Sequence, residues 1–136
     1  MKQYARIIEH GIVLQDFSGI HEPEEGLSAI AQARAFMETQ PQGEVLLLTD
    51  ATGSVFNQDI AEAMRELAEH HKPWVRASVV IGLSPLMRLF FRAVVAATGR
   101  DIRALDSRTA AIAYLVARRA KLSAPSTAAG ASRRKP

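Results

Sequence analysis

Apolar and polar residues follow one another along the chain in blocks that predict strands and helices in alternation. Two short apolar-rich runs flank the segment Glu9-His10-Gly11, a pattern typical of a β-hairpin. The next apolar run is continuous and stops at Asp50, as expected for a strand that is buried on both faces. The strands predicted on these grounds cover residues 4–8, 12–17, 44–50, 74–81 and 102–105.

Each of the last four strands is followed by a segment whose apolar residues recur at helical spacing. The first such segment begins at Pro23, because proline suits the first helical position, and two glutamates follow in the first turn. Asn57 and Ser84 are good amino-terminal caps for the second and third helices. Either Asp106 or Ser107 is expected to cap the fourth.

The resulting order β-β-α-β-α-β-α-β-α predicts an α/β domain. Its sheet is expected to be mixed but mainly parallel, because only the amino-terminal hairpin adds an antiparallel pair, and the helices are expected to pack on the sheet. With 136 residues, of which 48% are hydrophobic, the chain is long enough for one substantial core. We expect one domain over residues 1–120.

The charges are unevenly distributed along the chain. All 14 acidic residues lie at or before Asp106, whereas several of the 17 basic residues lie beyond position 117. The composition from Ser123 onward is rich in alanine, serine, threonine, glycine and proline, so residues 121–136 are predicted to form a disordered basic tail. Such a tail either contacts an anionic surface by charge or only keeps the protein in solution. No specific nucleic-acid binding is expected, since the domain itself shows no basic face.

Cysteine is absent, which excludes disulfides, thiolate catalysis and cysteine-ligated metals. The amino terminus lacks the apolar core of a signal peptide, and no apolar run approaches the roughly 20 residues that span a bilayer. The sequence therefore predicts a cytoplasmic protein without a transmembrane segment.

Several short motifs along the chain point to a known family. They are Leu47-Leu48-Thr49-Asp50-Ala51-Thr52-Gly53, Lys72-Pro73, Val80-Ile81-Gly82-Leu83, Thr98-Gly99-Arg100 and Asp106-Ser107. With the predicted order of elements, they resemble the SpoIIAA-like bacterial proteins of the STAS/SEC14 type, whose fold is that of anti-sigma-factor antagonists. The resemblance spans residues 3–117 and implies a STAS-like sheet covered by helices.

The resemblance also implies a regulatory switch. In STAS antagonists, a partner kinase phosphorylates a serine at the start of the second helix. This chain has Gln58, Asp59 and Ile60 where Asp-Ser-Ser would stand, so the usual phosphoacceptor is missing. Asp59 either mimics a permanent negative charge at the helix amino end or only solvates that turn. Thr52 and Ser54 are either modified instead or hydrogen-bonded locally.

An enzymatic function is not expected. Asp50 ends a strand and begins a loop that has the outline of a phosphoryl-accepting aspartate, but the chain lacks the paired aspartates and the cations that phosphoryl transfer needs. The adjacent His70 and His71 should point about 100° apart on a helix, so they are not expected to share a metal. We expect no cofactor and no metal. The candidate switch loop comprises Asp50, Thr52, Ser54, Asn57 and Asp59.

The predicted third helix, residues 85–98, is apolar over more than one face. Leu86 and Leu89 begin the face assigned to the core. Met87, Phe91 and Val95 continue the apolar surface beside it. This second strip is part of a wide core face, a surface for a homodimer or another protein, or the wall of an apolar ligand pocket. With the flanking arginines, which either hold an anionic group or are simply solvated, the candidate interaction residues are Met87, Arg88, Phe91, Arg92 and Val95.

Two functions are consistent with these features. The first is a non-enzymatic regulatory module that binds another protein or itself and resembles anti-sigma-factor antagonists. The alternative is a carrier or sensor of a small apolar or lipid-like ligand, as the resemblance to SEC14-type proteins implies.

Overall fold

A computed structural model describes residues 3–123. Its five strands form one mixed sheet in the order β1-β2-β3-β4-β5. The first two strands pair antiparallel across the short 3-10 turn η1 (Glu9–Gly11), and all later neighbours pair parallel. The strands are β1 (Ala5–Ile7), β2 (Val13–Asp16), β3 (Val45–Asp50), β4 (Val75–Ile81) and β5 (Ile102–Leu105).

Each parallel strand is joined to the next by a helix, as the sequence predicts. The helices are α1 (Pro23–Met37), α2 (Gln58–His70), α3 (Pro85–Thr98) and α4 (Arg108–Ser123). The expected α/β class, mixed sheet and order of elements are confirmed. That the arrangement is specifically STAS-like stays a prediction.

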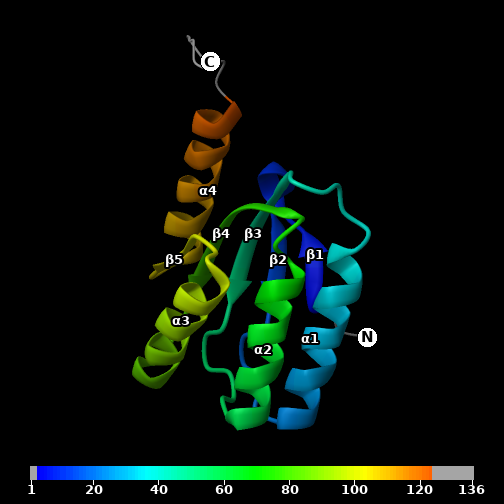
Figure 1. Ribbon diagram of the computed structural model, residues 1–136, viewed down its shortest axis with the longest axis vertical. Helices are drawn as coiled ribbons and strands as arrows, with labels where there is room; N and C mark the ends of the chain where they lie inside the picture. The colour runs from blue at the N-terminus through cyan, green and yellow to red at the C-terminus, as the bar shows by residue number, and fades with distance from the viewer. Residues whose placement is uncertain (1–2, 124–136) are drawn as a thin grey trace.

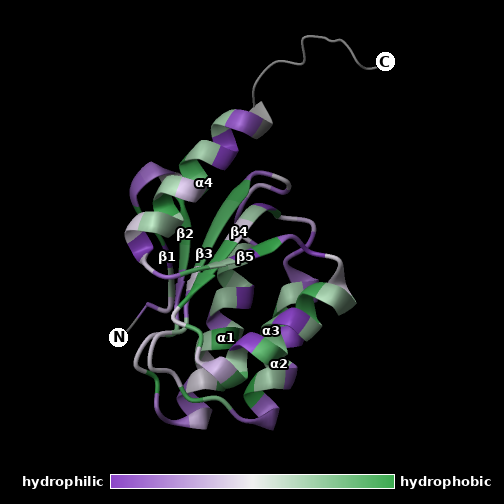
Figure 2. Cartoon of the chain, turned by 90° about the vertical axis from the view of Figure 1, so that its left-hand side faces the viewer, coloured by the Kyte–Doolittle hydropathy of each residue, from purple (hydrophilic) through white to green (hydrophobic). Residues whose placement is uncertain are grey.

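The helices lie on opposite sides of the sheet (Figure 1). Helices α1, α2 and α3 lie on one side and α4 on the other, as the turned view shows (Figure 2). Alternating residues of the buried strands point to opposite faces of the sheet. Leu46 and Leu48 of β3 pack with Leu115 of α4, whereas Leu47 packs with Met37 of α1. Strand β3 is therefore buried on both faces, as its continuous apolar run predicts.

The predicted caps form as expected. The Asn57 side chain accepts a hydrogen bond from the backbone N–H of Ile60 at 2.8 Å, and the Ser84 hydroxyl accepts one from that of Met87 at 3.2 Å. Ser107, rather than Asp106, caps α4, because its hydroxyl accepts from the backbone N–H of Ala110 at 3.1 Å. These local contacts explain why the helix starts could be predicted from sequence.

Helix α4 runs past the predicted boundary between domain and tail at residues 120 and 121. Helix α4 continues through Ser123, so residues 121–123 are helical rather than part of a disordered segment. The rest of the expected tail lies outside the described residues.

The faces of α3 are also placed differently from the prediction. Leu86 and Leu89, expected in the core, are 62% and 64% exposed, whereas Met87, expected on a neighbouring strip, is 6% exposed. Met87, Val94 and Thr98 are the buried residues of this helix. Because α3 is apolar around most of its circumference, periodicity alone does not fix which face turns inward.

Candidate functional site

The side of the sheet that carries α1, α2 and α3 holds an apolar cavity of about 120 Å³. Side chains from these helices and from β3 and β4 form its wall, with Ala51 after β3 and Leu83 after β4. Apolar residues of the wall include Ile30, Leu47, Ile60, Leu67, Val80, Met87 and Val94.

Helix α3, which contributes to the cavity wall, packs against α2. Two residues of the cavity wall, Phe56 before α2 and Phe90 of α3, contact each other through their rings, with centroids 5.3 Å apart. On the opposite side of the sheet, α4 packs directly on β3 and β4 through the fully buried Ala111 and Leu115. The space under α3 therefore lies on the side of the sheet opposite α4.

One part of the cavity wall is polar. Gln15, Thr49 and His71 line it and are hydrogen-bonded to one another. The Gln15 amide nitrogen donates to Thr49 Oγ1 at 2.8 Å, which leaves Gln15 Oε1 to accept from His71 Nε2 at 2.5 Å. Burial lowers the pKa of His71 to about 3, and the nearby charges of His70, Arg100 and Arg34 act in the same direction. His71 is therefore neutral at physiological pH and serves as a hydrogen-bond donor.

His70 extends this hydrogen-bonded chain toward the surface. Its Nδ1 lies 2.9 Å from Nδ1 of His71, and its Nε2 lies 2.7 Å from Oε2 of Glu38. The two rings thus contact each other through these nitrogens, and Trp74 stacks on the His70 ring. Among residues 3–123, no group of three or more potential metal ligands gathers here or elsewhere.

Arg100 contributes a partly buried positive charge to the same cavity. Its Nη1 donates to the carbonyl of Ala68 in the last turn of α2, at 3.2 Å. Its Nη2 is buried and has no hydrogen-bond partner within the described part of the chain. Burial lowers the pKa of Arg100 to about 10, although the charge of Glu69 opposes this shift. Even so, Arg100 is charged at neutral pH.

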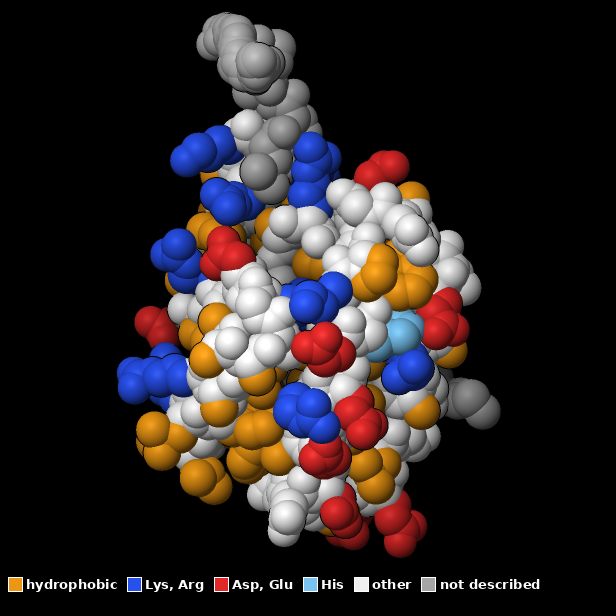
Figure 3. Space-filling model, in the orientation of Figure 1, with side chains coloured by type: hydrophobic (Ala, Val, Ile, Leu, Met, Phe, Trp, Pro, Cys, Tyr) orange, Lys and Arg blue, Asp and Glu red, His pale blue; other side chains and the backbone are white. Residues whose placement is uncertain are grey.

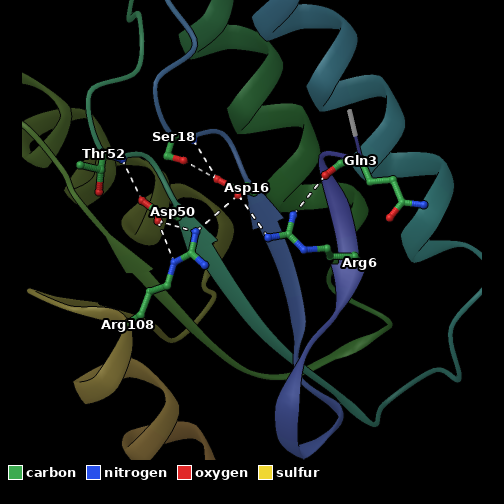
Figure 4. Close-up of polar contacts among 7 residues, drawn as sticks. All are labelled: Gln3, Arg6, Asp16, Ser18, Asp50, Thr52 and Arg108. Atoms are coloured by element: carbon green, nitrogen blue, oxygen red, sulfur yellow. Dashed lines mark hydrogen bonds and ion pairs between the residues drawn. The ribbon is translucent and has the colours of Figure 1, made fainter. Parts of the chain in front are cut away.

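The predicted switch loop is organised around Asp50 at the end of β3 (Figure 4). Asp50 is 5% exposed; one carboxylate oxygen accepts from the backbone N–H of Thr52 at 3.0 Å, and the other accepts from Arg108 Nε at 3.1 Å. Arg108 also approaches Asp16 at the end of β2, with 3.4 Å between Nη2 and Oδ2. One arginine at the start of α4 therefore bridges two strand-end carboxylates.

Asp16 has further partners that keep it charged. Burial alone would raise the pKa of its carboxyl, but hydrogen bonds from Ser18 and the charges of Arg108 and Arg6 outweigh burial, and the pKa is lowered. The Ser18 hydroxyl donates at 2.5 Å, and Arg6 Nη2 lies at 3.5 Å. This cluster connects β1, β2, β3 and α4 and serves the fold.

The other switch-loop candidates do not converge on one point. The Ser54 hydroxyl donates to the Ala51 carbonyl at 2.8 Å, and Asn57 caps α2. Thr52 is exposed at the tip of the loop, and Asp59 is exposed in the first turn of α2. The structure therefore brings Asp50 and Ser54 into local hydrogen bonding and leaves Thr52 and Asp59 at the surface.

The predicted interaction strip on α3 is divided between cavity and surface. Met87 and Phe91 line the cavity, so a contact-surface role is wrong for the buried Met87. Val95 is half-buried. Arg88 is exposed and lies 3.7 Å from Asp106, and Arg92 is exposed as well. Of the alternatives for this helix, the cavity wall agrees with Met87 and Phe91.

Comparisons with protein-family models, curated proteins and solved structures gave no match. Membership of the SpoIIAA-like family stays a prediction from the sequence. Within residues 3–123, no helix combines the length and the apolar character needed to cross a membrane.

Proposed function

We propose that this protein is a non-enzymatic carrier or sensor that binds a small, mainly apolar ligand in the cavity under α3. The observation that supports this function is the apolar cavity of about 120 Å³ between the sheet and α1, α2 and α3. An apolar cavity of about 150 Å³ accepts benzene, so a ligand of about six carbons matches the available space. The resemblance to STAS/SEC14-type proteins points to the same class of ligand.

The apolar wall supplies only part of the binding free energy. Burying a CH₂ group contributes about 0.8 kcal/mol, so a six-carbon chain gains about 5 kcal/mol before the costs of association are subtracted. A purely apolar ligand of this size is thus expected to bind weakly.

Binding of 1-hexanol tests this proposal. Titration followed by amide chemical shifts should show saturable binding with the largest shifts in α2, α3 and β4. The variant Ala68→Leu adds a larger side chain to the cavity wall and should weaken binding. Ala31→Leu makes the same change on the exposed face of α1 and should leave binding unchanged. Absence of saturable binding to the unaltered protein would refute the proposal.

A second candidate function is suggested by the outer face of α3. Leu86 and Leu89 are exposed in the amino-terminal half of this helix, where hydrophobic side chains gather at the lower end of α3 (Figure 3). Exposed apolar side chains that lie together are typical of a protein contact surface, here for self-association or another protein. The double variant Leu86→Glu/Leu89→Glu should abolish a dimer detected by sedimentation, whereas Leu27→Glu on α1 should not. A wild-type protein that sediments as a monomer at high concentration excludes self-association through this face.

A further inference from the structure

Arg100 places a cation in a cavity whose wall is otherwise mainly apolar. Its Nη1 is used by the Ala68 carbonyl, whereas the buried Nη2 has no hydrogen-bond partner among residues 3–123. Leaving a buried charged donor unpaired is costly, and proteins normally satisfy such groups. The guanidinium thus keeps one donor that this part of the chain does not satisfy.

The residues around this charge are poor candidates for that partner. Gln15 and Thr49 are committed to each other, and Gln15 also accepts from His71. Glu69 acts on Arg100 through its charge, but it is exposed and lies 3.8 Å from Lys72. The ion pairs found within residues 3–123 do not include Arg100. A ligand oxygen that carries negative charge would satisfy Nη2 directly.

We infer that the ligand is a small monocarboxylate whose anionic head pairs with Arg100 and whose hydrocarbon part fills the apolar cavity; this inference rests on the proposed function. A single negative charge fits because Arg100 is the only cation among the described residues that line the cavity, since His71 is neutral. A dianionic phosphate would leave excess charge in an apolar space. The carboxylate also suits the planar guanidinium, which forms strong charge-assisted hydrogen bonds with it.

The inference is tested by comparing hexanoate with 1-hexanol, which share a six-carbon chain and differ in the charge of the head group. Dissociation constants are measured by calorimetry at neutral pH for the wild type, Arg100→Gln, Arg100→Lys and Arg92→Gln. Arg92 is exposed on the same helix that covers the cavity, so its variant controls for the loss of a surface charge. Binding of 1-hexanol reports whether each variant keeps its cavity.

The wild type and Arg92→Gln should bind hexanoate about tenfold or more tightly than 1-hexanol, because a hydrogen bond to a charged group contributes at least that factor. Arg100→Gln should lose this preference and still bind 1-hexanol, and Arg100→Lys should retain part of it. Equal binding of the two probes by the wild type, or an unchanged preference in Arg100→Gln, overturns the inference while the apolar site stands. If neither probe binds the wild type, the proposed function itself fails.

Discussion

Thr52 lies directly against Gly82, which joins the loop after β3 to the loop after β4. A Cβ atom placed on Gly82 would lie 2.1 Å from Thr52 Oγ1 and 2.5 Å from the Thr52 backbone nitrogen. The same nitrogen donates to Asp50, so Thr52 cannot move away without breaking that hydrogen bond. Gly82 also has φ +78°, a conformation that favours glycine. The two loops can therefore meet only if this position lacks a side chain.

Gly82→Ala is expected to destabilise the protein strongly. Gly53→Ala is the matched control, because Gly53 also has a positive φ but a Cβ atom there would meet nothing within 4 Å. The free energy of unfolding of the control should fall by about 1–2 kcal/mol, because alanine disfavours this backbone conformation. Gly82→Ala should lose a further 1–3 kcal/mol or so, because a backbone segment must shift. Urea unfolding measures both, and equal losses would show that Thr52 imposes no steric limit.

Replacing Arg108 should destabilise the protein, because Arg108 bridges the carboxylates of Asp16 and Asp50. Arg108→Gln removes a cation from Asp16 and Asp50, so the free energy of unfolding should fall at neutral pH. The pKa of Asp16 lies below its ordinary value of 3.8 in the folded protein, so its ionised form contributes stability above that value. This contribution is lost as pH falls through the lower, folded pKa. The variant and the wild type should therefore converge in stability under strongly acidic conditions.

Urea titrations between neutral and acidic pH measure this effect. Arg118→Gln is the control, because Arg118 lies 3.4 Å from the exposed Asp101 and an exposed pair contributes little. A difference between Arg108→Gln and the wild type that stays constant down to the lowest pH would contradict an electrostatic role for Arg108.

Protonation of His71 should destabilise the fold at mildly acidic pH. Its folded pKa of about 3 lies below the ordinary value of 6.5, so the unfolded chain binds a proton that the folded chain does not. The contribution of the neutral His71 to the free energy of unfolding is fully present above pH 6.5 and is lost as pH falls from there toward 3. The slope within this window should approach about 1.4 kcal/mol per pH unit.

The variant His71→Gln should be less stable at neutral pH but lose less stability on acidification. It keeps a side-chain donor for Gln15 but cannot be protonated. His21→Gln, at an exposed position, controls for the removal of one histidine. If His71→Gln and the wild type show the same slope between pH 6.5 and 4, the buried neutral histidine is not what makes stability depend on pH here.

The elements that the sequence predicted correctly are those whose signals are local. Asn57 and Ser84 cap the helices that follow them, and the apolar run before Asp50 is buried on both faces, because each depends on neighbours within a few positions. The orientation of α3 could not be predicted in the same way. Its apolar surface is too wide for periodicity to distinguish Met87 from Leu86.

The sequence offered an apolar pocket beside α3 only as one of several alternatives, and the polar residues of the cavity could not be predicted, because they are brought together only by the tertiary fold. Gln15 on β2, His71 after α2 and Arg100 after α3 are far apart in sequence. Gln15 was the available signal, since a polar residue within a buried strand needs a partner. The motif that contains Arg100 contributed only to the family resemblance, and nothing local indicated that Nη2 of its side chain is buried.

The cavity should become smaller when Gly26 of α1 is replaced by alanine. A Cβ atom at Gly26 would lie 2.7 Å from Cδ1 of Ile60, the flexible end of a side chain that lines the cavity with Gly26. Alanine favours the helix by about 1 kcal/mol over glycine, which offsets the displacement of Ile60.

Gly26→Ala should therefore keep its melting temperature within a few degrees of the wild type and bind 1-hexanol more weakly, because the new Cβ and the displaced Ile60 Cδ1 occupy part of the cavity. Adding Ile60→Val removes Cδ1 and should restore binding, at a cost of about 0.5–1.5 kcal/mol in stability. Thermal unfolding and 1-hexanol titration of the wild type, the two single variants and the double variant compare stability and binding. A large loss of stability in Gly26→Ala that Ile60→Val does not relieve would mean that the helix backbones, not the Ile60 side chain, oppose the change.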